Sequence, residues 1–142
     1  MEQSKPSLLE ELNKTVQMSL EVTNIILPKI EDNALREVVL NQRKHYEELI
    51  EKINELCTAR KLKVTVPKFD SMMLWGSIQM HTLKDSSPEH IAELMVNGTN
   101  MAIVDMIKTV NDAENEEPNT KKLAQSYIDQ EEKNLEELKK HL

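Results

Sequence analysis

Apolar residues recur at intervals of three or four along four segments of the chain, which is the spacing of an amphipathic α-helix. The segments cover residues 7–31, 33–61, 87–110 and 119–142. Each segment has one broad apolar stripe and a polar opposite face, so each helix can bury one side against its neighbours. The pattern predicts an all-α fold in which four helices pack around a shared core.

Local signals predict where the first two helices begin and end. Ser7 with Glu10 three positions later is a capping-box pattern, so the first helix is expected to begin there. Pro28 interrupts its apolar stripe, but Ile30 still falls on the helical spacing of that stripe. This favours a kinked helix that continues over a helix that ends at Pro28. Asp32 then supplies an N-cap after a very short break, so the second helix is expected to run antiparallel to the first.

The stretch between the second and third helices is expected to form a long crossover. Residues 63–68 alternate like a strand, but a proline among them and the lack of a partner strand predict an extended connector. Residues 70–83 are rich in methionine and other apolar residues, which predicts a short extra helix across the bundle. The third helix begins either at Ser86, in a capping box, or at Ser87, with Pro88 in the first helical position.

Composition restricts the domain count, the partners and the compartment. A chain of 142 residues with 39% hydrophobic content fits one domain over residues 1–142. The formal charge of −7 repels a phosphate backbone, so no nucleic-acid partner is expected. No apolar run is long enough to cross a bilayer, so no membrane partner is expected either. The polar start of the chain and the single Cys57 favour a cytoplasmic location.

Small or polar residues interrupt the apolar stripes near the middle of each expected helix. Four-helix bundles build metal, cofactor and ligand sites from side chains at this height. These positions are therefore the candidate ligand-binding residues: Ser19 and Thr23 in the first helix, Gln42 and His45 in the second, Gly98 in the third, and Glu131 and Asn134 in the last.

The order of these elements resembles the ferritin-like superfamily. The likeness is nearest to small bacterial ferritin-like domains of unknown function, and it is strongest over residues 38–67 (VVLNQRKHYEELIEKINELCTARKLKVTVP) and 118–142. The resemblance implies an up-and-down four-helix bundle with a long crossover that carries a short extra helix.

The resemblance also implies where a di-iron centre would lie. Ferritin-like di-iron proteins take one Glu from each of two helices and a Glu-x-x-His motif from each of the other two. In this chain Gln42-x-x-His45 and Glu131-x-x-Asn134 stand at the places of the two motifs. Small residues stand where the other two Glu residues would be, namely Ser19 or Thr23 and Gly98. One carboxylate and one imidazole are too few ligands for two irons, so we expect a degenerate site and no cofactor.

Two interpretations of this degenerate centre stay open. The polar side chains of the second and last helices can form a hydrogen-bonded layer that fixes helix register. Alternatively, Ser19 and Gly98 can leave room for a small-ligand pocket. We therefore expect a ferritin-like protein of unknown biochemical role that acts without catalysis, through oligomerisation, a protein partner or a small ligand. The alternative is a metal-binding protein that uses His45 and Glu131.

Overall fold

The protein is an all-helical bundle, as the sequence predicts. The computed structural model describes residues 7–62, 77, 78, 80, 82, 85–113 and 117–142. Its helices are α1 (Leu8–Ile26), the 3-10 turn η1 (Leu27–Lys29), α2 (Asn33–Ala59), α4 (Pro88–Asp112) and α5 (Pro118–Lys139). The connector expected at 63–68 and most of the short helix expected at 70–83 lie outside the described residues.

Side-chain caps fix the starts of the first three long helices. Ser7 Oγ accepts a hydrogen bond from the Glu10 amide at 3.2 Å, which confirms the expected start of α1. Asp32 Oδ1 accepts from the Leu35 amide at 2.8 Å at the start of α2. For α4, Ser87 is the cap, with Pro88 in the first turn, so the second of the two expected arrangements is the one observed. These caps satisfy amide donors that the first turn of a helix leaves without partners.

The end of α1 differs from the prediction. We expected a kinked helix that continues to residue 31, but α1 ends at Ile26 and η1 follows it. Pro28 has no amide hydrogen to donate to the preceding turn, so the chain tightens into a 3-10 turn. Ile30 is still buried, at 1% exposure, so the apolar phase is kept although the helix is not.

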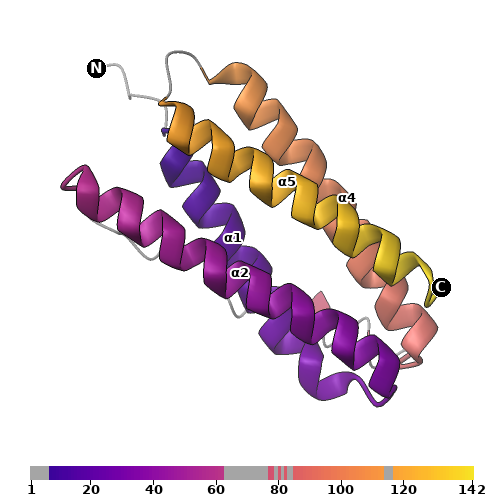
Figure 1. Ribbon diagram of the computed structural model, residues 1–142. Helices are drawn as coiled ribbons and strands as arrows, with labels where there is room; N and C mark the ends of the chain where they lie inside the picture. The colour runs from indigo at the N-terminus through magenta and orange to yellow at the C-terminus, as the bar shows by residue number, and fades with distance from the viewer. Residues whose placement is uncertain (1–6, 63–76, 79, 81, 83–84, 114–116) are drawn as a thin grey trace.

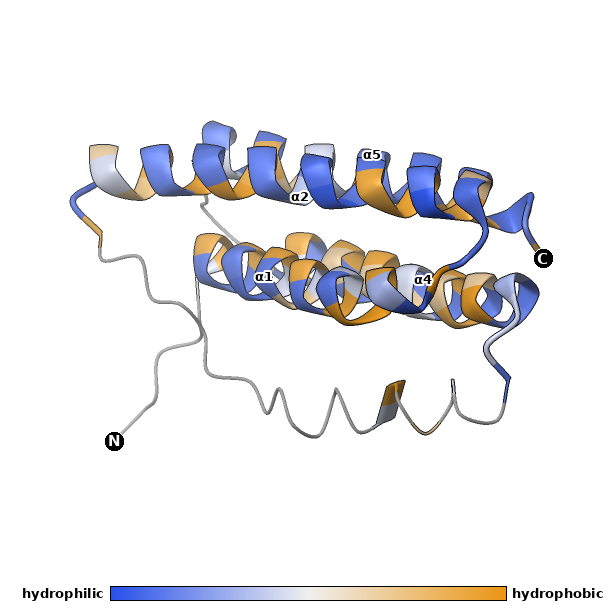
Figure 2. Ribbon diagram, turned by 90° about the horizontal axis from the view of Figure 1, so that it is seen from below, coloured by the Kyte–Doolittle hydropathy of each residue, from blue (hydrophilic) through white to orange (hydrophobic). Residues whose placement is uncertain are grey.

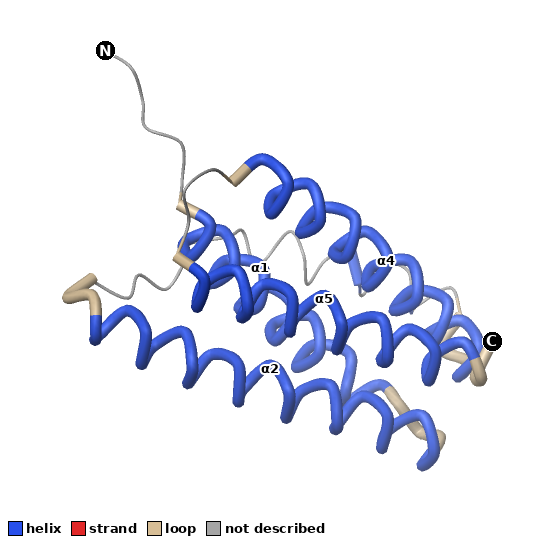
Figure 3. The backbone as a smooth tube through the Cα atoms, turned by 45° about the horizontal axis from the view of Figure 1, so that its top comes forward, coloured by secondary structure: helices blue, strands red, loops and turns tan. Residues whose placement is uncertain are grey.

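The four long helices form two antiparallel hairpins packed face to face. The α1–α2 hairpin and the α4–α5 hairpin lie side by side, with α2 next to α5 and α1 next to α4 (Figure 1). In Figure 2, α2 and α5 form one layer and α1 and α4 form the other, and the apolar faces of the helices turn toward the space between the layers. No strand occurs among the residues that the structure describes (Figure 3).

The directions of the helices decide how far apart the end of α2 and the start of α4 lie. α2 and α4 run in the same direction, and α1 and α5 run in the opposite one (Figure 1). The C-terminal end of α2 and the start of α4 therefore lie at opposite ends of the bundle.

The apolar core consists of two clusters along the bundle axis. One lies near the start of α1 and the other near the start of α2. The first cluster comprises Leu8, Leu9, Leu12, Val16, Tyr46, Leu49, Ile53, Cys57, Ile103, Met106, Ala124, Tyr127 and Ile128. The second comprises Ile26, Leu27, Ile30, Leu35, Val39, Ile78, Ile91, Ala92, Met95 and Leu138. Cys57, the single cysteine of the chain, is a small residue of the first cluster.

The C-terminal end of α2 is tied to the start of α5. Arg60 Nε donates to Glu117 Oε2 at 3.0 Å, and an Arg60 terminal nitrogen also pairs with the same carboxylate. That nitrogen donates to Thr120 Oγ1 at 2.8 Å, and Thr120 is fully buried. The contact holds two helix ends that are far apart in sequence.

Lys61 follows this end in a backbone conformation that favours glycine. Its φ is 57°, the left-handed region. The Leu62 amide bonds to the Cys57 carbonyl at 2.8 Å and the Lys61 amide bonds to the Thr58 carbonyl at 3.0 Å. These two bonds form a Schellman motif, in which glycine usually occupies the position held here by Lys61.

We predict that Lys61→Gly stabilises the protein by about 0.5–1 kcal/mol, because it removes the left-handed strain of a side chain. The free energy of unfolding from urea titration measures this effect. Lys52→Gly, in the interior of α2, should instead destabilise by about 1 kcal/mol. Equal losses from both substitutions would contradict the assignment.

Candidate functional site

A layer of buried polar residues separates the two apolar clusters. On every long helix, this layer lies between residues of the first cluster and residues of the second. Its members are at most 7% exposed. They are Thr23 on α1, Gln42 on α2, Thr99 on α4, and Glu131 and Asn134 on α5.

Glu131 is the carboxyl group of this layer, and donors from two helices surround it. The Tyr46 hydroxyl donates to Glu131 Oε1 at 2.6 Å. Asn134 Nδ2, one turn further along α5, donates to the same oxygen at 2.9 Å. The Asn134 amide oxygen in turn accepts from Gln130 at 3.3 Å. Glu131 is only 1% exposed, so these bonds replace its hydration.

The second carboxyl oxygen of Glu131 has weaker contacts. The Tyr127 hydroxyl lies 3.4 Å from Oε2 but only 3.0 Å from Ser19 Oγ. Ser19 Oγ can also donate to the Thr15 carbonyl at 2.9 Å. Either hydroxyl can donate in the short contact between Ser19 and Tyr127, and Tyr127 has only one hydrogen for its two contacts. Oε2 is left without a short hydrogen bond from the described residues.

Burial determines the electrostatics of the site. Desolvation raises the pKa of Glu131 above its ordinary value, although hydrogen bonds from Tyr46, Asn134 and Tyr127 act in the opposite direction. Burial, followed by the nearby Glu131 charge, also raises the pKa values of Tyr46 and Tyr127. Both phenols therefore keep their protons and remain hydrogen-bond donors.

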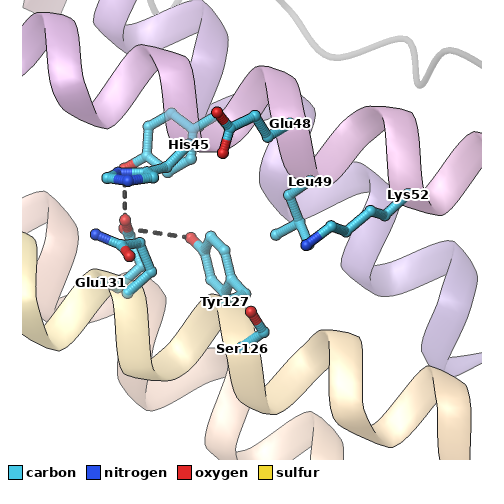
Figure 4. A pocket seen from close by; sticks show the side chains of 9 residues that line it. His45, Glu48, Leu49, Lys52, Ser126, Tyr127 and Glu131 are labelled. Atoms are coloured by element: carbon cyan, nitrogen blue, oxygen red, sulfur yellow. Dashed lines mark hydrogen bonds between the residues drawn. The ribbon is translucent and has the colours of Figure 1, made fainter.

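A pocket of about 150 Å³ opens between α2 and α5 beside Glu131. Figure 4 shows that side chains from the two helices point toward one another around it. Its lining residues are His45, Tyr46, Glu48, Leu49 and Lys52 from α2, and Ser126, Tyr127, Gln130 and Glu131 from α5. The Nδ1 atom of His45 is buried and has no hydrogen-bond partner among the described residues.

The candidate residues do not all gather at this site. Ser19 reaches Glu131 through Tyr127, and Asn134 bonds to Glu131 directly. Thr23 is buried but donates back to the Ser19 carbonyl at 2.8 Å. Gly98 is exposed, and a Cβ built on it would have no neighbour within 4 Å. The buried residue at this height of α4 is the next one along the chain, Thr99.

Gln42 lies in the layer without joining its network. It is fully buried, and neither of its side-chain amide atoms has a hydrogen-bond partner among the described residues. Glu131 and Asn134 bond to each other as a hydrogen-bonded layer requires, whereas the structure shows no such bond for Gln42 among the described residues.

Sequence reasoning missed the two tyrosines that complete the site. Neither Tyr46 nor Tyr127 is among the candidate residues, and their rings lie 6.4 Å apart with a 39° tilt. Their signal was available, because a buried tyrosine needs a partner for its hydroxyl and Tyr127 precedes Glu131 by one helical turn.

Comparison with known proteins gives no match to a family model, a curated protein or a solved structure. None of the helices in the described part of the chain is both long and apolar enough to cross a membrane.

We predict that Glu131→Gln removes a pH dependence of stability. The folded pKa of Glu131 is raised above 4.5, so its stabilising contribution is present below that pH and is lost as pH rises through the folded value. Between the unfolded and folded pKa values, the free energy of unfolding of the wild type should fall by about 1.4 kcal/mol per pH unit relative to the variant. Urea unfolding across pH measures the difference.

The matched control is Glu132→Gln, because Glu132 is the next residue and is exposed. Its stability should follow that of wild type at every pH. Parallel curves for wild type and Glu131→Gln would show that Glu131 titrates normally.

We also predict that Gln42→Leu stabilises the protein by about 1–2 kcal/mol, because it removes a buried amide that has no partner among the described residues. Gln42→Glu has nearly the same shape and should destabilise, since it buries a second carboxyl group. Thermal and urea unfolding measure both effects. A loss of stability in Gln42→Leu would show that the amide is satisfied.

Proposed function

We propose that this protein is a ferritin-like bundle that has kept the architecture and lost the di-iron centre, and that it acts without catalysis by binding a small ligand. The ferritin-like part is supported by the helix directions. A connection from the end of α2 to the start of α4 must run the length of the bundle, and one long crossover is typical of ferritin-like folds.

The observation that carries the loss of the metal centre is the set of contacts of Glu131. Its Oε1 atom already accepts two short hydrogen bonds, from Tyr46 and Asn134. A cation at that oxygen would have to displace both donors. Among the described residues, no three His, Cys, Asp or Glu side chains come together in a group that could hold a metal ion. Two irons need several hard oxygen ligands, so the residues present do not fit a di-iron centre.

The small-ligand part rests on the pocket beside the same carboxyl group. The pocket brings together an underused carboxyl oxygen, Glu131 Oε2, and an unpartnered ring nitrogen, His45 Nδ1. Leu49 and the two tyrosine rings supply apolar wall. Apolar walls with a few converging polar groups are typical of small-molecule sites.

We predict that the purified protein, without a His-tag, holds no stoichiometric iron and shows no oxygen-dependent Fe(II) oxidation above buffer. Elemental analysis and an Fe(II) oxidation assay measure this. Gln42→Glu with Asn134→His should increase metal binding and lower stability until metal is supplied, because the new groups are buried. Two tightly bound irons per unmodified chain would overturn the proposal and favour the metal-binding alternative.

A further inference from the structure

We infer that the pocket between α2 and α5 binds a small organic ammonium ion, whose N–H groups donate to Glu131 Oε2. This inference rests on the proposed function, since it names the ligand class of the same pocket. It is carried by three features: the open oxygen, the missing countercharge and the size of the pocket.

The open oxygen, Glu131 Oε2, can accept a hydrogen bond from a ligand. Glu131 Oε1 is fully engaged, whereas the nearest donor to Oε2 is the Tyr127 hydroxyl at 3.4 Å. The same hydroxyl lies closer to Ser19 Oγ, at 3.0 Å, so its contact with Oε2 is the longer of the two. A donor that enters the pocket therefore finds a carboxyl oxygen with unused lone pairs.

The buried carboxylate of Glu131 has no countercharge within ion-pair distance in the described part of the chain, so a cation in the pocket would stabilise it. No ion pair of Glu131 occurs among the described residues, although a buried carboxylate is strongly disfavoured without one. Tyr46 and Tyr127 line the pocket, and the π face of an aromatic ring attracts organic cations. Glu48 and Lys52 also line the pocket, and both side chains are exposed to solvent.

The size of the pocket restricts the ligand to about six heavy atoms. A protein cavity of about 150 Å³ is known to hold one benzene molecule. The pocket here is of that volume, about 150 Å³. An alkylammonium of this size can place its nitrogen beside Glu131 and its hydrocarbon part against Leu49.

The test compares three probes of equal size: pentylamine hydrochloride, pentan-1-ol and sodium butanoate. Each is titrated into the ¹⁵N-labelled full chain and followed by amide shifts around Tyr127 and Glu131. Pentylamine should bind about tenfold or more tightly than either of the other probes, because only it forms a charge-assisted hydrogen bond to the carboxylate.

Three variants assign the binding to the pocket and to the carboxylate. Glu131→Gln should weaken pentylamine binding about tenfold or more and leave pentan-1-ol unchanged. Glu132→Gln makes the same charge change on the exposed face of α5 and should leave every affinity unchanged. Ser126→Leu, at an exposed position that lines the pocket, should remove the shifts caused by all three probes.

The outcomes distinguish a failure of the ammonium inference from a failure of the small-ligand proposal. Pentan-1-ol or butanoate binding as well as pentylamine would overturn the ammonium inference and leave the small-ligand proposal standing. Undiminished pentylamine binding in Glu131→Gln would also overturn the inference alone. If none of the three probes shifts the pocket amides, both the inference and the small-ligand part of the proposed function fail.

Discussion

Glu131 places a carboxyl group at the centre of an apolar bundle, where it is almost fully buried. Burying an isolated charge in such surroundings is strongly unfavourable, so the group must be neutral or well supplied with donors. Glu131 meets both conditions in part, since burial raises its pKa and two short hydrogen bonds hold one of its oxygens. The second oxygen has only a longer contact with Tyr127, and Glu131 lines a pocket between α2 and α5.

The hydrogen bonds of Glu131 specify one relative position of the helices, which apolar contacts alone do not. Aliphatic side chains can repack in several registers at little loss, whereas a hydrogen bond needs one relative position of donor and acceptor. Tyr46 and Ser19 belong to the α1–α2 hairpin, while Glu131 and Tyr127 belong to the α4–α5 hairpin. The contacts among these four side chains therefore fix how the two hairpins face each other.

Much of the fold could be predicted from the sequence because local signals determine it. Ser7, Asp32 and Ser87 cap the helices that their sequence contexts indicate. The helix expected to continue past Pro28 ends at Ile26, because regular spacing of apolar residues does not require an unbroken helix. A 3-10 turn followed by an extended residue also brings Ile30 to the core.

The site was less predictable, since it depends on helix rotation and on partners distant in sequence. Neighbouring residues on a helix point about 100° apart, and the sequence did not decide whether Gly98 or Thr99 faces inward. The reason is that α4 has apolar residues on both sides: Ile103 is buried, while Met101 and Val104 are exposed. The pairing of Tyr46 with Glu131 spans 85 residues, so no local pattern encodes it.

The division of the site between two hairpins has a consequence for the folding pathway. Each hairpin joins helices that are neighbours in sequence, and such local contacts form faster than distant ones. Glu131 loses its water only when the hairpins dock, because Tyr46 comes from the other hairpin. The pKa of Glu131 therefore rises, and the group takes up a proton, when the two hairpins dock. In the pH range between its unfolded and folded pKa values, a lower pH therefore stabilises the docked arrangement of the two hairpins.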